Sequence, residues 1–90
     1  MQLNRDGVQL EKEGNFAASV EKYRAALKLM PSQTIFRRNL ALVLCRLGRW
    51  EEGIYELKEV LKEDSEDTVA TRALSIALEN AQKAKEVGGN

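Results

Sequence analysis

The sequence predicts an all-α fold, a short α-solenoid of five helices arranged as antiparallel helix–turn–helix repeats. Its 90 residues contain only six glycines and one proline, and this composition favours helix over strand. Apolar residues recur at helical spacing, as Leu40, Val43, Leu44 and Leu47 illustrate. The sequence also overlays itself when it is shifted by 34 residues, which is typical of repeat architectures.

This 34-residue period preserves residue character at many matched positions. The first shift places Gly14 on Gly48 and Phe16 on Trp50. The other matched pairs are Leu10 and Leu44, Val20 and Ile54, Leu27 and Leu61, Lys28 and Lys62, Thr34 and Thr68, Ile35 and Val69, Arg38 and Arg72, Leu40 and Leu74, Leu42 and Ile76, and Leu44 and Leu78. A fixed period places these side chains in equivalent surroundings, so we predict nested hairpins of equal length.

The helix limits follow from the residues that interrupt the pattern. Gly14 and Gly48 follow helix ends, where a left-handed residue closes the last turn without strain. Pro31 ends the second helix, and Ser65 or Asp67 is expected to cap the fifth. The predicted helices are 2–13, 16–29, 34–47, 50–63 and 68–86. We expect one domain over residues 1–87, with repeats at about 1–33 and 34–67, a capping helix at about 68–86, and a disordered tail at 88–90.

Small residues recur where the helices of a pair are expected to approach closely. Gly7, Ala41 and Ser75 form one such row, and Ser19 and Gly53 form the facing row. A glycine inside an isolated helix costs up to about 1 kcal/mol relative to alanine, so its presence here indicates close packing. The aromatic residues one position into each second helix are expected to wedge beneath the following hairpin rather than to stack on a cofactor.

The period and its landmarks resemble the tetratricopeptide repeat family. The segments from Gly14 to Pro31 and from Gly48 to Lys62 carry the resemblance, which covers nearly the whole chain. It implies two full repeats and a single closing helix that solvates the end of the array. Asp6 departs from the pattern, because leucine stands at this place in the later copies. We therefore expect looser packing of the first helix and consider that the chain derives from a longer array.

The resemblance also implies a curved array whose concave face is lined by the first helix of each repeat. On that face Val8, Leu42 and Ile76 form an apolar row, and Arg38 and Arg72 lie one repeat apart. Such a surface suits a peptide with apolar anchors and carboxylates, because arginine binds a carboxylate through two parallel hydrogen bonds. The predicted groove residues are Asn4, Val8, Lys12, Arg38, Asn39, Leu42, Arg46, Arg72 and Ile76. Alternatively, the apolar row packs against neighbouring helices or a second copy, and the arginines are merely solvated.

One ligand class of the family is disfavoured by the residues present. Members that bind the acidic C-terminal tails of heat-shock chaperones use a clamp of lysines, asparagines and an arginine. Asn39 matches one clamp position, whereas Asn4, Val8, Val69 and Ala73 stand at the others and lack the required groups. We therefore do not expect chaperone-tail binding.

Catalytic and metal-binding patterns are absent from the sequence. There is no histidine, and Cys45 is the single cysteine, so acid–base catalysis, nucleophilic triads and zinc sites lack their usual residues. The acidic stretches at 51–52 and 63–67 lack the alternating ligands and glycine of a calcium loop. No glycine-rich phosphate loop occurs. We expect a protein that is not an enzyme and that holds no cofactor or metal, with Cys45 as a small apolar packing residue or part of the groove.

The charge distribution limits the partners. Fourteen basic and fourteen acidic side chains cancel, which disfavours nucleic acid and anionic membranes. Residues 1–50 nevertheless carry a net charge of +5 and residues 51–90 one of −5, which would suit steering or head-to-tail stacking unless it is a chance imbalance. No stretch of about 18 apolar residues and no signal peptide is seen, so we expect a cytoplasmic protein. The predicted function is peptide binding to a partner protein, and the alternative is a self-associating scaffold segment, for example a homodimer.

Overall fold

The computed structural model describes residues 1–88, and this part consists of five α-helices joined by short turns. The helices are α1 (Gln2–Lys12), α2 (Phe16–Leu29), α3 (Thr34–Arg46), α4 (Trp50–Glu63) and α5 (Thr68–Gly88). The all-α prediction is confirmed, and the helix limits agree with the predicted ones to within two residues. Helix α5 continues to Gly88, beyond its predicted end, and the rest of the predicted tail lies outside the described residues.

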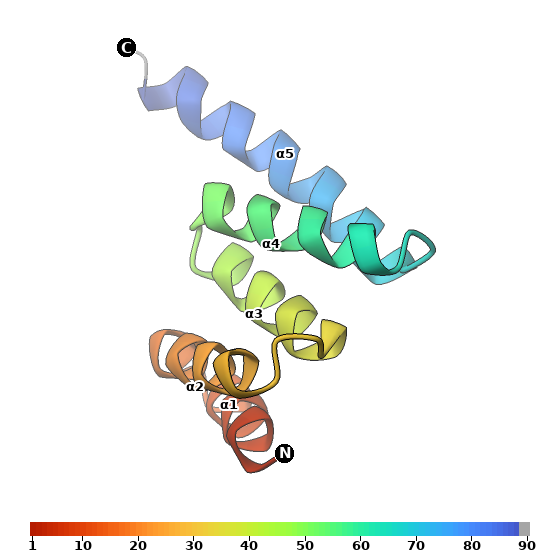
Figure 1. The fold of residues 1–90 in the computed structure, drawn as a ribbon. Coiled ribbons are helices and arrows are strands. Elements are labelled where there is room, and N and C mark those ends of the chain that lie inside the picture. Colours follow the sequence, from red (N-terminus) through yellow and green to blue (C-terminus); the bar gives the residue numbers. More distant parts are fainter. Residues whose placement is uncertain (89–90) are drawn as a thin grey trace.

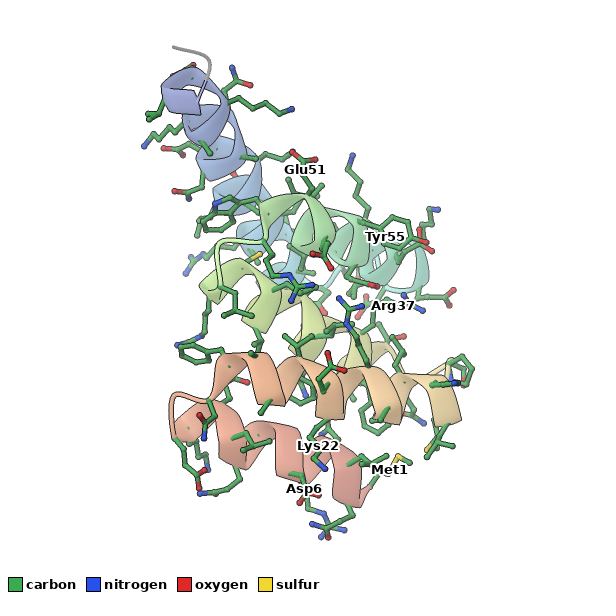
Figure 2. All side chains as sticks on the ribbon, turned by 90° about the vertical axis from the view of Figure 1, so that its left-hand side faces the viewer. Met1, Asp6, Lys22, Arg37, Glu51 and Tyr55 are labelled. Atoms are coloured by element: carbon green, nitrogen blue, oxygen red, sulfur yellow. The ribbon has the colours of Figure 1, made fainter. Side chains whose placement is uncertain are left out.

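Successive helices pack side by side and form a tetratricopeptide-like array (Figure 1). Helices α1 and α2 form the first antiparallel hairpin, α3 and α4 form the second, and α5 packs on α4 (Figures 1 and 2). The described ends of the chain lie at opposite ends of the array, whose extents are 43 × 29 × 19 Å. None of the described helices combines the length and apolarity that spanning a bilayer requires. The cytoplasmic location stays a prediction.

Two glycines make the tight turns inside the hairpins possible. Gly14 has a φ of +81° and Gly48 a φ of +75°, in the left-handed region that glycine adopts without strain. In each turn the residue after the glycine donates its amide to the carbonyl five residues earlier, at 2.8 and 2.9 Å. These bonds satisfy carbonyls at the helix end and reverse the chain. The predicted role of both glycines is confirmed.

Asp67, rather than Ser65, caps the fifth helix. Its Oδ1 accepts a hydrogen bond from the amide of Ala70 at 2.9 Å, and its Oδ2 accepts one from Arg38 at 3.0 Å. Burial acts to raise the pKa of the Asp67 carboxyl, but the Ala70 amide and the Arg38 guanidinium outweigh it. The pKa therefore lies below its ordinary value. The Asp67 carboxylate therefore caps the first turn of α5 and, through Arg38, links α5 to α3.

The core consists of two clusters, and α3 contributes to both. The first cluster lies between α2 and α3 and contains Val20, Tyr23, Leu40, Val43 and Leu44. The second lies between α3, α4 and α5 and contains Ala41, Ile54, Leu57, Val60, Ala70, Ala77 and Ala81. Helix α3 is thus covered on two sides. The packing of each helix on the one before it holds the array together.

The predicted close approach within each hairpin is confirmed. A Cβ added to Gly7 would lie 2.5 Å from the Tyr23 ring, and Ser19 Oγ donates a hydrogen bond to the Gly7 carbonyl at 2.8 Å. A Cβ added to Gly53 would lie 2.7 Å from Cys45 Sγ. Both glycines therefore let neighbouring helices approach more closely than a side chain would allow.

The two ends of the array are less well covered than its centre. Ala41 is buried under α4, but Ser75, one repeat later, is exposed because none of the described helices covers that side of α5. At the other end, Gly7 is the buried residue of α1, and Asp6 accepts a hydrogen bond from Gln2 at 2.6 Å. The looser packing expected around Asp6 stays a prediction.

Candidate peptide-binding groove

A groove lies along α3 and α5 on the face of the array that these helices share with α1. It consists of two hollows of about 490 and 370 Å³, which have Leu42, Ala73 and Ile76 in common. The first hollow is also lined by Thr68, Val69 and Arg72. The second is also lined by Glu11, Cys45, Arg46 and Trp50. Because the hollows share their central side chains, they form one continuous groove with chemically different ends.

The floor of the groove is aliphatic and half open to solvent. Ile76 is 51% exposed and Val69 is 47% exposed, and Leu42 of α3, which lines the first hollow with them, is partly buried. Covering apolar surface is favourable by roughly 25 cal/mol per Å². Val8, the third member of the predicted apolar row, instead packs against the first core cluster. The row is therefore open at α5 and partly closed at α1.

The two arginines that lie one repeat apart have different surroundings. The Arg38 guanidinium donates to Asp67 at 3.0 Å, and its side chain is 29% exposed. Arg72 is exposed and lines the first hollow, and within residues 1–88 no carboxylate oxygen lies within 4.0 Å of its guanidinium. Arg72 is thus available to an external carboxylate, whereas Arg38 already has a partner inside the chain.

The predicted groove residues near α1 hold the helices together. Asn39 Nδ2 donates a hydrogen bond to Asn4 Oδ1 at 3.0 Å and so links α3 to α1. Neither asparagine lines the two hollows, and Lys12 is exposed near the end of α1 without lining them. The structure therefore places Leu42, Arg46, Arg72 and Ile76 together in the groove and the other predicted residues beside it.

Arg46, which lines the second hollow, covers the aromatic ring of Phe16. Its guanidinium carbon lies 5.7 Å from the centroid of the Phe16 ring, and its Nε lies 3.7 Å from Glu11 Oε2. Glu11 Oε1 also accepts a hydrogen bond from the Tyr23 hydroxyl at 2.8 Å. Burial, together with this bond to a carboxylate, raises the pKa of Tyr23 well above its ordinary value. These contacts fix Glu11 and Arg46 in the groove wall.

Cys45 lines the second hollow without being an activated nucleophile. Its sulfur fills the space above Gly53, and burial raises the pKa of its thiol. No group of three or more potential metal ligands occurs among residues 1–88. The thiol is therefore a small apolar part of the groove wall.

Six residues that line the two hollows are absent from the nine predicted groove residues, and Glu11, Cys45 and Ala73 are three of them. Thr68, Val69 and Trp50 line the hollows in addition to the predicted residues. The repeat provides a signal for Val69, because Ile35 occupies the equivalent position and is also half exposed. The sequence predicts only a packing role for Trp50, and the side chain does pack against the second core cluster. Trp50 also lines the second hollow because the neighbouring side chains leave part of its ring uncovered, and the sequence pattern does not predict this.

No protein-family model matches the sequence, but two known proteins are similar to it. The chain is 29% identical over 84 residues to Sperm-associated antigen 1 of Rattus norvegicus, across 93% of this chain and 9% of that protein. It is 26% identical over 88 residues to Photosystem I assembly protein Ycf3 of Synechococcus sp. (strain CC9605), across 94% of this chain and 51% of that protein. The chain therefore spans about half of one relative and about a tenth of the other. Because both similarities run through nearly the whole chain, they concern the entire array rather than a single helix.

Proposed function

We propose that the chain is a non-enzymatic protein–protein interaction module of the tetratricopeptide repeat family, which binds a peptide segment of a partner protein in the groove along α3 and α5. One observation carries the proposal: a half-exposed aliphatic floor lies beside Arg72, a cation without a carboxylate partner in the described part of the chain. One relative is named for the assembly of photosystem I, and an interaction role suits such a name.

The groove chemistry favours a segment with aliphatic side chains and an acidic residue. Aliphatic anchors would cover Leu42 and Ile76, and a carboxylate would bind the fork of N–H donors on Arg72. A few such contacts must offset the loss of freedom of the bound segment. We therefore expect a dissociation constant on the order of 1–100 μM.

A selection from a library of random peptides displayed on phage tests this proposal and needs no identified partner. Enriched peptides are synthesised and titrated against the wild-type protein and the Arg72→Glu variant. We expect Arg72→Glu to weaken binding about tenfold or more, because a charge-assisted hydrogen bond becomes a repulsion.

Lys22→Glu is the matched control, because Lys22 is exposed on α2 and lines neither hollow (Figure 2). This reversal of charge is expected to change affinity by less than about twofold. Failure to enrich any peptide, or an equal loss of affinity in both variants, would contradict the proposed groove. Circular dichroism of both variants checks that the helices are intact.

The self-associating scaffold stays an alternative prediction. Leu78, one repeat beyond the buried Leu44, is 47% exposed on the uncovered side of α5 and would suit a contact with a second copy. Light scattering over a range of concentrations tests it. A particle mass that stays at that of the monomer would rule out this alternative and leave the peptide groove unaffected.

A further inference from the structure

The aromatic residue of the second hairpin lacks the cation that covers its counterpart in the first. Arg46 lies over the Phe16 ring, with its guanidinium carbon 5.7 Å from the ring centroid. One repeat later, Trp50 takes the place of Phe16 and Asn80 takes the place of Arg46. The Asn80 amide donates to the Ile76 carbonyl at 2.8 Å, and no cation in residues 1–88 lies over the Trp50 ring.

The packing of α5 is the same, but two residues differ: Asn80 takes the place of Arg46, and Cys45 takes the place of Glu11, whose Oε2 lies 3.7 Å from Arg46 Nε. Leu40 and Val43 pack on the first hairpin, and their counterparts Leu74 and Ala77 pack on the second. Because the register is the same in both interfaces, position 80 is the counterpart of position 46, the position that covers Phe16. Asparagine at this position has neither the length nor the charge to cover the ring.

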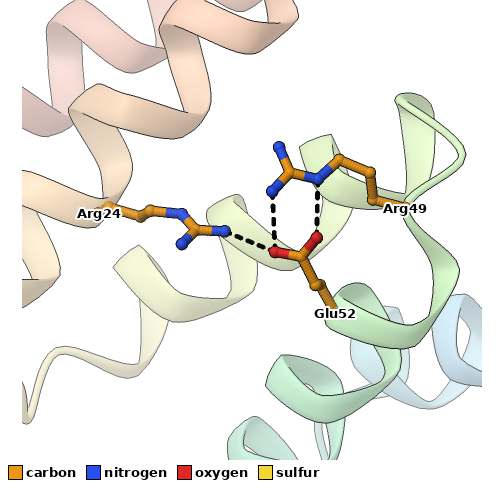
Figure 3. A network of polar contacts seen from close by, with 3 residues as sticks. All are labelled: Arg24, Arg49 and Glu52. Atoms are coloured by element: carbon orange, nitrogen blue, oxygen red, sulfur yellow. Dashed lines mark hydrogen bonds and ion pairs between the residues drawn. The ribbon is translucent and has the colours of Figure 1, made fainter.

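Three cations share a hollow with Trp50, namely Arg46, Arg49 and Lys85, and each of them lies within 4.0 Å of a carboxylate oxygen. Arg49 donates to both oxygens of Glu52, at 2.8 and 2.9 Å, and Glu52 also accepts a bond from Arg24 at 2.7 Å (Figure 3). Lys85 Nζ lies 3.8 Å from a Glu51 oxygen. Within residues 1–88 none of these cations lies over the Trp50 ring.

Trp50 is also accessible from the groove. It is only partly buried, and it lines the second hollow together with Leu42 and Ile76. It borders a further hollow of about 410 Å³, which is lined by the small side chains of Ala81 and Ala84 and also by Arg49 and Lys85. Tryptophan is the aromatic side chain that binds cations most strongly.

We propose that the bound peptide segment supplies the missing cation, as an arginine or lysine side chain seated on Trp50. This inference rests on the proposed peptide-binding function. It gives the segment a direction because, of the two hollows that form the groove, Arg72 lines the first and Trp50 lines the second. A carboxylate binds at the Arg72 end, aliphatic side chains cover the shared centre, and the cation binds at the Trp50 end.

The test compares peptides selected on the wild-type protein with peptides selected on the Asn80→Arg variant, which places an internal cation over Trp50 as Arg46 does over Phe16. We expect the wild-type selection to enrich arginine or lysine at a fixed distance from the aliphatic residues. The Asn80→Arg selection is expected to retain the aliphatic residues and to lose this enrichment.

Enriched peptides are then synthesised with arginine and with citrulline, its neutral isostere. The emission of Trp50, the single tryptophan of the chain, reports binding directly. Replacing arginine by citrulline should weaken binding to the wild type about 3- to 30-fold and should leave binding to Asn80→Arg unchanged. Calorimetric titration of a Trp50→Leu variant is expected to give equal affinities for the arginine and citrulline peptides. Asn80→Arg keeps the test valid if the removal of the indole impairs folding.

The outcomes separate this inference from the proposed function. Peptides that bind the groove without a cation, or that bind the wild type equally with arginine and citrulline, overturn the role of Trp50 and leave the groove in place. If the Asn80→Arg variant still binds the arginine peptide more tightly than the citrulline peptide, the proposed role of Trp50 is wrong as well. If no peptide is enriched on the wild type, both proposals fall.

Discussion

The face shared by α1, α3 and α5 is closed beside α1 and open beside α5. At the α1 side, Val8 packs into the first cluster and Asn4 binds Asn39. At the α5 side, Ile76 and Arg72 line an open hollow. Equivalent positions of a repeat therefore do not have equivalent surfaces, because the side chains on the neighbouring helix decide which positions stay exposed.

Two leucines one repeat apart should differ most in how strongly their truncation destabilises the fold. Leu44 is completely buried between α2 and α3, whereas Leu78 is half exposed on α5. Leu44→Ala should lower the free energy of unfolding by about 2–5 kcal/mol, since it removes buried methyl groups and leaves a cavity. Leu78→Ala should cost about 1 kcal/mol or less. Urea denaturation of both variants measures the difference, and equal costs would mean that the structure assigns the wrong faces to α3 and α5.

The next prediction compares the two glycines at the hairpin contacts. A Cβ at Gly7 meets the ring of Tyr23, which is buried and cannot move away. Gly7→Ala should destabilise the fold by about 1–3 kcal/mol, although alanine favours helix. A Cβ at Gly53 meets the thiol of Cys45, a side chain end that can rotate, so Gly53→Ala should stay within about 1 kcal/mol of the wild type. Thermal unfolding of both variants checks the order, and a more harmful Gly53→Ala would contradict it.

A smaller effect concerns the carboxylate that joins α5 to α3. Asp67→Ala removes the cap on Ala70 and should cost about 0.5–2 kcal/mol at neutral pH. Because the pKa of Asp67 is lowered on folding, its charge stabilises the fold above the ordinary aspartate pKa of about 3.9. This contribution is lost as the pH falls below that value. The stability of the wild type relative to Asp67→Asn should therefore decrease in acid, as measured by urea denaturation at several pH values.

Asp64→Asn removes one negative charge from the same turn and is the matched control for that experiment. An identical pH dependence for Asp67→Asn and Asp64→Asn would contradict the special role of Asp67.

A further prediction compares Arg38→Gln with Arg72→Gln in peptide binding to the groove. Because Arg38 binds Asp67 inside the chain, its loss should leave peptide affinity within about twofold, whereas Arg72→Gln should weaken binding.

The sequence predicts the fold more completely than the groove, and the reason is physical. Helix ends depend on local features such as the positive φ of Gly14 and Gly48, and buried positions recur with the period. The state of Arg38 depends on Asp67, a residue 29 positions away whose predicted role is only that of a helix cap. Likewise, the open ring of Trp50 depends on what stands at position 80. A surface property needs the identity of several neighbours in space, which a repeat pattern does not supply.

The smallest effect concerns the ion-pair network on the exposed surface between the two hairpins. Glu52 binds Arg49 and Arg24, and the pKa of Glu52 lies below its ordinary value because of the Arg49 hydrogen bonds and then the Arg24 bond (Figure 3). All three side chains are more than two-fifths exposed, so water and salt screen the attraction. Glu52→Gln should lower the melting temperature slightly in dilute buffer and not at all in concentrated salt. A loss that persists in salt would mean that the network, and not the buried side of α3, aligns the hairpins.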